Sequence, residues 1–270
     1  IRRKCTSACA AGALSSDTRD AHARNRSPWS VNVASAVATH FGGELFWSPW
    51  RRRRHTRVKT ARRRSNSSTR WLERQLNDPY VAAARRDGYA SRAAFKLQEL
   101  DEKFGLLKPG MRVLDLGAAP GGWCQVALKK MNGRGSIVGV DLLEFGPIDG
   151  ASCHILDVET PDSETQMREW LGGPADLVLS DMAPSTTGHQ TTDQIRVVAL
   201  AEVAFEVAQS LLKPDGAFVV KLFQGGAVGD FLATLKRDFR IVRHAKPPAS
   251  RKDSSELYLV AQGFRGTPPG

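Results

Sequence analysis

From about Trp71 onward, strand-like and helix-like stretches alternate along the chain, and this order constrains the fold more than any other feature. Short apolar runs rich in Val, Leu and Ile predict strands, and longer stretches with helical periodicity lie between them. Such alternation is typical of a mostly parallel sheet covered by helices on both faces. Seven strands are predicted, at Met111–Leu116, Ser136–Val140, Cys153–Leu156, Asp176–Ser180, Ala217–Leu222, Arg240–Val242 and Leu257–Ala261.

Helices are predicted between and before these strands. They cover residues 71–87 with an interruption near Pro79, then 91–104, a stretch from about Trp123, and 163–171, 193–212 and 227–238. The α/β domain is therefore expected at 71–263. A basic arm at 1–70 precedes it, and a flexible tail rich in Gly and Pro follows at 264–270.

The basic charge of the chain is concentrated in its first part. Of 39 Lys and Arg and 28 Asp and Glu, residues 1–75 hold 17 and 4, which leaves the remainder close to neutral. Arg51–Arg54 and Arg62–Arg64 lie in a stretch without periodicity, so we expect the arm to be disordered until it meets a partner. That partner is expected to be RNA, although an Arg-rich, acid-poor segment also resembles an organellar transit peptide.

The cysteines and the apolar runs exclude several classes of protein. Cys5, Cys9, Cys124 and Cys153 form no CxxC pair, so neither a disulfide framework nor a zinc site is expected. Membrane-spanning helices need about 18 to 20 apolar residues, and no run approaches that length. We therefore expect a protein of a reducing compartment, with no membrane partner and no metal.

A glycine-rich turn follows the predicted strand Met111–Leu116. Its glycines, Gly117, Gly121 and Gly122, allow a ligand to approach the backbone closely at the carboxyl end of a strand. The spacing is GxxxGG, whereas turns that hold the pyrophosphate of a dinucleotide usually read GxGxxG. A nicotinamide-dependent oxidoreductase is thus a weaker interpretation than a protein that binds S-adenosylmethionine.

Carboxylates at three successive strand ends support the same cofactor. Asp115 ends the strand before the turn, Asp141 follows the second strand, and Asp157 follows the third. Asp141 is placed to accept both ribose hydroxyls of the cofactor, and Asp157 to meet its adenine amino group. Each carboxylate alone could be a helix cap or a turn former. Their joint position around one glycine turn favours a binding site.

The segment Ser180–Pro184 (SDMAP) constrains the atom that would be methylated. Methyltransferases that act on amino groups usually carry Asn/Asp-Pro-Pro-aromatic at this place, and those that act on cytosine carbon offer Pro-Cys. Neither sequence is present, so an oxygen target fits best.

Three charged residues lie close to predicted apolar surfaces. Lys221 lies within an apolar strand, where an unpaired lysine would be costly. Lys96 borders the apolar stripe of its predicted helix, and Glu256 immediately precedes the last strand. Taken singly, Lys96 and Glu256 are also compatible with ordinary surface charges.

Five segments carry a resemblance to a known family. In chain order they are Ser91–Leu97 (SRAAFKL), Gly117–Trp123 (GAAPGGW), Ser180–Pro184 (SDMAP), Val219–Gly225 (VVKLFQG) and Ser254–Tyr258 (SSELY). Together they resemble the FtsJ/RrmJ family of ribosomal RNA ribose methyltransferases over about residues 70–263. The resemblance implies a Rossmann-like fold and S-adenosylmethionine as cofactor. It also implies methylation of a ribose 2′-hydroxyl, in bacterial members that of a uridine in the 23S rRNA of the large ribosomal subunit.

The resemblance also implies the site residues. A catalytic tetrad carries over to Lys96, Asp181, Lys221 and Glu256, and cofactor roles carry over to Gly121, Trp123, Asp141, Asp157 and Asp181. Lys221 could accept the hydroxyl proton or stabilise the developing alkoxide, and the sequence does not choose between these roles. Basic residues expected to contact RNA phosphates are Arg85, Arg86, Arg92, Lys129, Lys130, Arg251 and Lys252.

Three alternatives remain at this stage. A cap or tRNA ribose methyltransferase would use the same chemistry, and a non-catalytic RNA-binding or ribosome-assembly factor could keep the fold. The oxidoreductase is the third. The preferred interpretation is a monomeric enzyme of the bacterial cytoplasm, or of mitochondria if the arm is a transit peptide.

Overall fold

The computed structural model describes residues 56–63, 65–185, 187–225 and 228–266, which belong to one structural unit. Most of the expected basic arm, with Arg51–Arg54, lies outside these ranges, and so do Cys5, Cys9 and the end of the expected tail. Cys124 and Cys153 are free thiols. Within the described ranges, no helix has both the length and the apolarity that crossing a bilayer requires.

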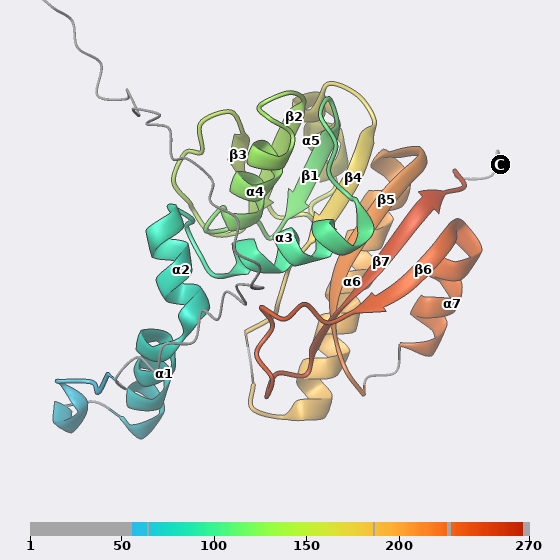
Figure 1. The fold of residues 1–270 in the computed structure, drawn as a ribbon. Helices are drawn as coiled ribbons and strands as arrows, with labels where there is room; N and C mark the ends of the chain where they lie inside the picture. Colours follow the sequence, from blue (N-terminus) through green and yellow to red (C-terminus); the bar gives the residue numbers. More distant parts are fainter. Residues whose placement is uncertain (1–55, 64, 186, 226–227, 267–270) are drawn as a thin grey trace, which may run out of the picture. The chain divides into compact units, whose positions relative to one another are not determined.

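Seven strands form a single sheet in the order β3-β2-β1-β4-β5-β7-β6 (Figure 1). Neighbours from β3 to β5 are parallel, and β7 lies antiparallel between β5 and β6. The predicted fold class, a mostly parallel seven-stranded sheet, is confirmed. The strands are β1 Arg112–Leu116, β2 Ser136–Asp141, β3 Ser152–Ile155, β4 Ala175–Ser180, β5 Leu212–Phe223, β6 Phe239–Ala245 and β7 Glu256–Phe264.

Helices cover both faces of the sheet (Figure 1). On one face, α3 (Ala93–Phe104) and α4 (Gly122–Lys130) bury apolar side chains such as Leu97 and Val126 against the strands. On the other, Met167, Val197 and Phe231 belong to the second apolar cluster. They come from α5 (Ser163–Leu171), α6 (Gln190–Leu211) and α7 (Gly229–Asp238). The central strands β1, β2 and β4 are buried along most of their length, as parallel strands covered on both faces usually are.

Two further helices, α1 (Asn66–Asn77) and α2 (Pro79–Asp87), precede the sheet, after a short 3-10 helix, η1 (Ala61–Arg63). One interrupted helix was predicted for 71–87, and the break falls at Asp78. This residue is extended because a following proline disfavours the helical conformation, and its side chain caps α2 at the backbone N–H of Tyr80. Helix α1 begins earlier than predicted, because the Ser65 hydroxyl accepts a hydrogen bond from the N–H of Ser68 and starts the helix there.

The parallel register brings the carboxyl ends of several strands to one edge of the sheet. Leu116 of β1 pairs with Val140 of β2 and with Ser180 of β4, and Ser180 pairs with Val220 of β5. The residues that follow these positions, from the glycine turn to Lys221, therefore gather at this edge, where α/β sheets usually bind ligands.

Gly139 in the centre of β2 provides a test of the packing beneath this edge. A Cβ atom there would lie 2.8 Å from Sγ of Cys124 and 3.1 Å from Cβ of Ala118. We expect Gly139→Ala to lower the free energy of unfolding by about 1 to 3 kcal/mol, since a fully packed layer cannot accept another methyl group. Urea denaturation measures the change. Gly146→Ala is the control, because a Cβ at Gly146 meets no atom within 4 Å; equal effects of the two substitutions would contradict the packing argument.

Candidate active site

Lys221 and Asp181 form the centre of the candidate site. The Nζ atom of Lys221 lies 3.0 Å from Oδ1 of Asp181 and also donates to the backbone carbonyl of Asp181. The Lys221 side chain is only 7% exposed. A buried ammonium group needs such partners, because an isolated charge in the interior is costly. The pairing of β4 with β5 therefore also assembles this ion pair.

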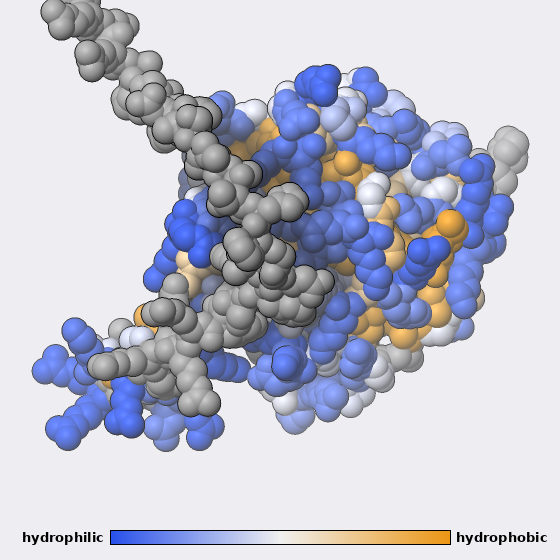
Figure 2. Space-filling view, in the orientation of Figure 1, coloured by the Kyte–Doolittle hydropathy of each residue, from blue (hydrophilic) through white to orange (hydrophobic). Residues whose placement is uncertain are grey.

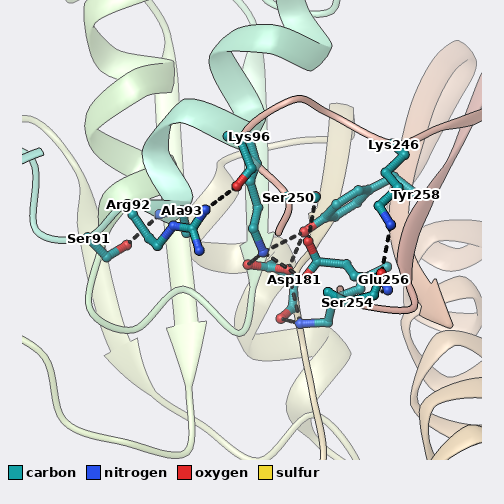
Figure 3. Close-up of polar contacts among 12 residues, drawn as sticks. Ser91, Arg92, Ala93, Lys96, Asp181, Lys246, Ser250, Ser254, Glu256 and Tyr258 are labelled. Atoms are coloured by element: carbon teal, nitrogen blue, oxygen red, sulfur yellow. Dashed lines mark hydrogen bonds and ion pairs between the residues drawn. The ribbon is translucent and has the colours of Figure 1, made fainter. Parts of the chain in front are cut away.

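Lys96 and Glu256 complete the group from two other elements (Figure 3). Lys96 extends from α3, and its Nζ lies 2.7 Å from Oε2 of Glu256 and 3.8 Å from Oδ2 of Asp181. Glu256 begins β7, and its Oε1 accepts a hydrogen bond from the Ser250 hydroxyl at 2.7 Å. The fold thus brings together all four residues of the expected tetrad, although Lys96 and Glu256 are 160 positions apart in the chain.

The pKa of Asp181 reflects two opposed effects. Desolvation alone would raise it, but the charges of Lys221 and Lys96 and the hydrogen bond from Tyr258 together lower the pKa below its usual value. Asp181 therefore remains ionised at neutral pH and holds both lysines. Two ammonium groups and two carboxylates leave the group without net charge, which permits its partial burial.

Tyr258 is a fifth polar member that the sequence did not reveal. Its ring is fully buried, and it lies opposite Lys221 in the β5–β7 pairing. Its hydroxyl donates to Oδ1 of Asp181 at 2.7 Å and accepts from Nζ of Lys96 at 3.1 Å (Figure 3). The sequence does carry one indication that Tyr258 belongs to the site: it follows Glu256 by two residues, and this spacing places both side chains on one face of a strand.

The glycine turn lies beside this group. Gly117 and Gly121 have positive φ angles of 76° and 102°, and a Cβ atom on Gly117 would lie 2.8 Å from Cγ of Met182. Trp123 follows at the start of α4, where its side chain is 3% exposed and its indole N–H donates to the Ala93 carbonyl. The indole N–H is therefore occupied by α3.

The carboxylates at the strand ends have the expected positions. Asp141 accepts hydrogen bonds from the N–H groups of Ala119 and Leu143, so it ties the glycine turn to the end of β2. Asp157 accepts from the N–H of Glu159 and lies just beyond the end of β3. Each carboxylate keeps lone pairs for a further donor.

Asp115 lies buried beneath the glycine turn, with 1% of its surface exposed. Burial raises its pKa to about 7, although the Cys124 thiol donates to Oδ2 at 3.2 Å and opposes the rise. Its Oδ1 atom is buried without a partner. A ligand with a cationic or hydrogen-donating group at this turn would relieve that cost, so the residues present fit S-adenosylmethionine. In the described part of the chain, no three His, Cys, Asp or Glu side chains cluster so as to hold a metal ion.

Comparison with known proteins identifies the family. The sequence model of the family described as FtsJ-like methyltransferase matches residues 89–264, more than half of the chain. This chain belongs to the FtsJ-like methyltransferase family. The resemblance inferred from the five motifs is thereby confirmed.

Named relatives of the FtsJ-like protein cover most of the chain. "Ribosomal RNA large subunit methyltransferase E" of Acidiphilium cryptum is 61% identical over 215 residues, which is 80% of this chain and 95% of that protein. The protein of the same name from Bradyrhizobium sp. (strain BTAi1 / ATCC BAA-1182) is 54% identical over 220 residues, with 80% and 95% covered. A crystal structure from Plasmodium falciparum, described as a ribosomal RNA methyltransferase, has a TM-score of 0.61 and 28% identity, over 66% of this chain and 100% of that one.

The basic residues expected to contact RNA differ in their availability. Arg85, Lys129 and Lys252 are exposed, whereas Arg86 is paired with Asp87 and Lys130 with Asp101. The guanidinium of Arg92 lies 3.0 Å from Oδ2 of Asp78 and also donates to the Ala249 carbonyl. Arg251 pairs with the same Asp78 oxygen at 3.3 Å. In the FtsJ-like domain, Arg92 is thus a link between α2, α3 and the loop before β7, and its guanidinium is largely occupied.

The raised pKa of Asp115 predicts a specific pH dependence of stability. Because the folded pKa of about 7 lies above the ordinary 3.8, the native state binds more protons than the unfolded state between these values. Stability therefore falls as the pH rises from about 4 to 7, by on the order of 4 kcal/mol from this group. Asp115→Asn should remove this part of the slope. Urea denaturation at pH 4.5 and 7.5 measures it, and equal slopes in both proteins would contradict the prediction.

Removal of the Tyr258 hydroxyl tests the electrostatics of the tetrad. In Tyr258→Phe, Asp181 loses one of the hydrogen bonds that lower its pKa, so this pKa should rise. Carboxyl ¹³C NMR titration of the native and substituted proteins measures the change. Tyr89→Phe is the control, since that hydroxyl accepts a hydrogen bond from Gln98 away from the tetrad. An unchanged Asp181 titration in Tyr258→Phe would show that the hydrogen bond has no such effect.

Proposed function

We propose that this FtsJ-like protein transfers the methyl group of S-adenosylmethionine to a ribose 2′-hydroxyl of ribosomal RNA, namely a uridine of 23S rRNA in the large subunit. The observation that carries the proposal is the buried Lys221–Asp181 pair at the carboxyl edge of the sheet, with Lys96 and Glu256 beside it. The names of the relatives support ribosomal RNA as the substrate. Such a substrate would place the protein in the bacterial cytoplasm, where we expect it to act as a monomer without a metal.

The cofactor would lie along the edge formed by β1, β2 and β4. Gly117, Gly121, Gly122 and the backbone of Trp123 would line its amino-acid end, close to Asp181. Asp141 would accept the ribose hydroxyls, and Asp157 the adenine amino group, through lone pairs that their backbone donors leave free. When bound, S-adenosylmethionine supplies an electrophilic methyl group on a sulfonium.

The protein must orient the ribose oxygen and manage its proton. Lys221 donates to both the carboxylate and the carbonyl of Asp181, which leaves a third N–H for the ribose oxygen. We therefore favour Lys221 as a charged group that stabilises the developing alkoxide, while the proton leaves to water. Asp181, whose pKa is lowered, is a poor proton acceptor and instead positions the two lysines. Lys96 and Glu256 would hold the ribose.

Methyl transfer to purified large ribosomal subunits that lack the modification tests the proposal. With labelled cofactor, Lys221→Met should lower kcat by about 100-fold or more, as for the loss of one oxyanion-stabilising donor. Lys236→Met, at an exposed position of α7, is the matched control. Transfer to tRNA or capped RNA but not to subunits or naked rRNA would point to another substrate, and no transfer to any RNA would support a non-catalytic assembly factor.

Two further measurements define the chemistry. A methylated ribose oxygen cannot attack the adjacent phosphate, so the modified linkage should resist alkaline hydrolysis, whereas base methylation would leave it sensitive. If Lys221 acts as a cation, the single-turnover rate should not rise with an ionisation in the alkaline range. A rate that rises with such an ionisation would instead assign Lys221 the role of base.

A further inference from the structure

A cavity of about 430 Å³ opens beside Lys96 and Glu256 and extends away from the sheet to helix α1. Its size lies in the range of small-ligand sites. Besides the two tetrad residues, three elements contribute its polar lining. These are Arg74 and Gln75 of α1, Ser91 and Arg92 before and at the start of α3, and Arg251 and Ser254 of the loop before β7. The cavity therefore continues the candidate active site toward the N-terminal helices.

The charges around this cavity favour an anionic ligand. Arg92 and Arg251 share a single carboxylate, Asp78, at 3.0 and 3.3 Å. Arg74 is exposed, and no carboxylate of the described residues lies within ion-pair distance of it. Asp253 at the cavity contributes one negative charge. Three guanidinium groups thus face two carboxylates outside the tetrad, and the excess positive charge lies on the side of α1.

Helix α1 also presents an aromatic ring next to the cavity. Trp71 is 52% exposed, although a tryptophan of a folded domain is usually well buried. It precedes Arg74 by three residues and Gln75 by four, so all three lie on one face of the helix. The visible surface of η1 and α1 is mostly hydrophilic (Figure 2). An exposed indole beside an unpaired guanidinium is the combination that binds an unstacked base and its phosphate.

We propose that this cavity and the adjacent face of α1 bind a single-stranded nucleotide next to the ribose that is methylated. Trp71 stacks on its base, Arg74 binds a phosphate, and Gln75 offers an amide to the base edge. The inference rests on the proposed function, because Lys96 and Glu256 at the cavity are the groups assigned to the reacting ribose. A double helix does not fit this arrangement, since its bases are already stacked and paired.

The test is the binding of a short unstructured oligouridine by the full-length protein, measured by fluorescence anisotropy at several salt concentrations. Trp71→Ala should weaken binding about 10-fold or more, and Trp71→Phe should restore most of it. Arg74→Ala should reduce the slope of log affinity against log salt by about 0.7, the value for one phosphate of a single strand. In methyl transfer to large subunits, both alanine variants should raise KM and leave kcat unchanged.

Matched controls separate this role from a structural one. Leu76→Ala removes an exposed apolar side chain from the opposite face of α1. Arg134→Ala removes one positive charge just before the amino end of β2, away from the carboxyl edge that holds the candidate site. Neither should change binding, and calorimetry should give the same affinity for S-adenosylmethionine in all variants.

The outcomes distinguish the two proposals. Native-like binding and KM in Trp71→Ala and Arg74→Ala, or equal losses in the control variants, would overturn the nucleotide site. If the native protein binds the oligonucleotide, loses binding on these substitutions and yet methylates no ribose, the proposed function fails and the RNA site stands.

Discussion

The carboxylate of Asp181 is the group around which the site is organised. It receives Lys221 from β5, Lys96 from α3 and the Tyr258 hydroxyl from β7, so three elements meet at one side chain. Without this carboxylate, two buried ammonium groups would face each other in a region of low polarity, which is costly. The lowered pKa of Asp181 expresses the same coupling, because its ionised form is the one that these donors stabilise.

A second carboxylate, Asp78, organises the residues around the cavity near α1 in a comparable way. It caps α2, and its other oxygen binds both Arg92 and Arg251. Arg92 also donates to the Ala249 carbonyl, next to Ser250, which in turn holds Glu256. The N-terminal helices are thereby connected to the tetrad through polar contacts. In this protein, two arginines that could bind phosphate serve first to position backbone and side chains.

The features that were predicted best from the sequence are those that depend on the local pattern of apolar and polar residues. Strand ends are marked by the change from apolar to polar residues, which predicts Asp181 at the end of a strand, and Lys221 is conspicuous as a lysine within an apolar strand. Tyr258 was not predicted as a site residue, because a tyrosine within an apolar strand resembles a residue of the hydrophobic core. The pairing of Arg92 with Asp78 and the cavity near α1 could not be predicted, since they depend on how helices far apart in sequence pack in space.

The antiparallel strand β7 has a consequence for the order of events during synthesis. It inserts between β5 and β6, where it places Tyr258 opposite Lys221 and brings Glu256 to Lys96. A nascent chain that ends before residue 256 has the glycine turn, Asp181 and Lys221, yet the edge of β5 is open and Lys221 lacks its cross-strand neighbour. The proposed catalytic group is thus complete only after the last strand has left the ribosome, the particle whose RNA this protein is proposed to modify.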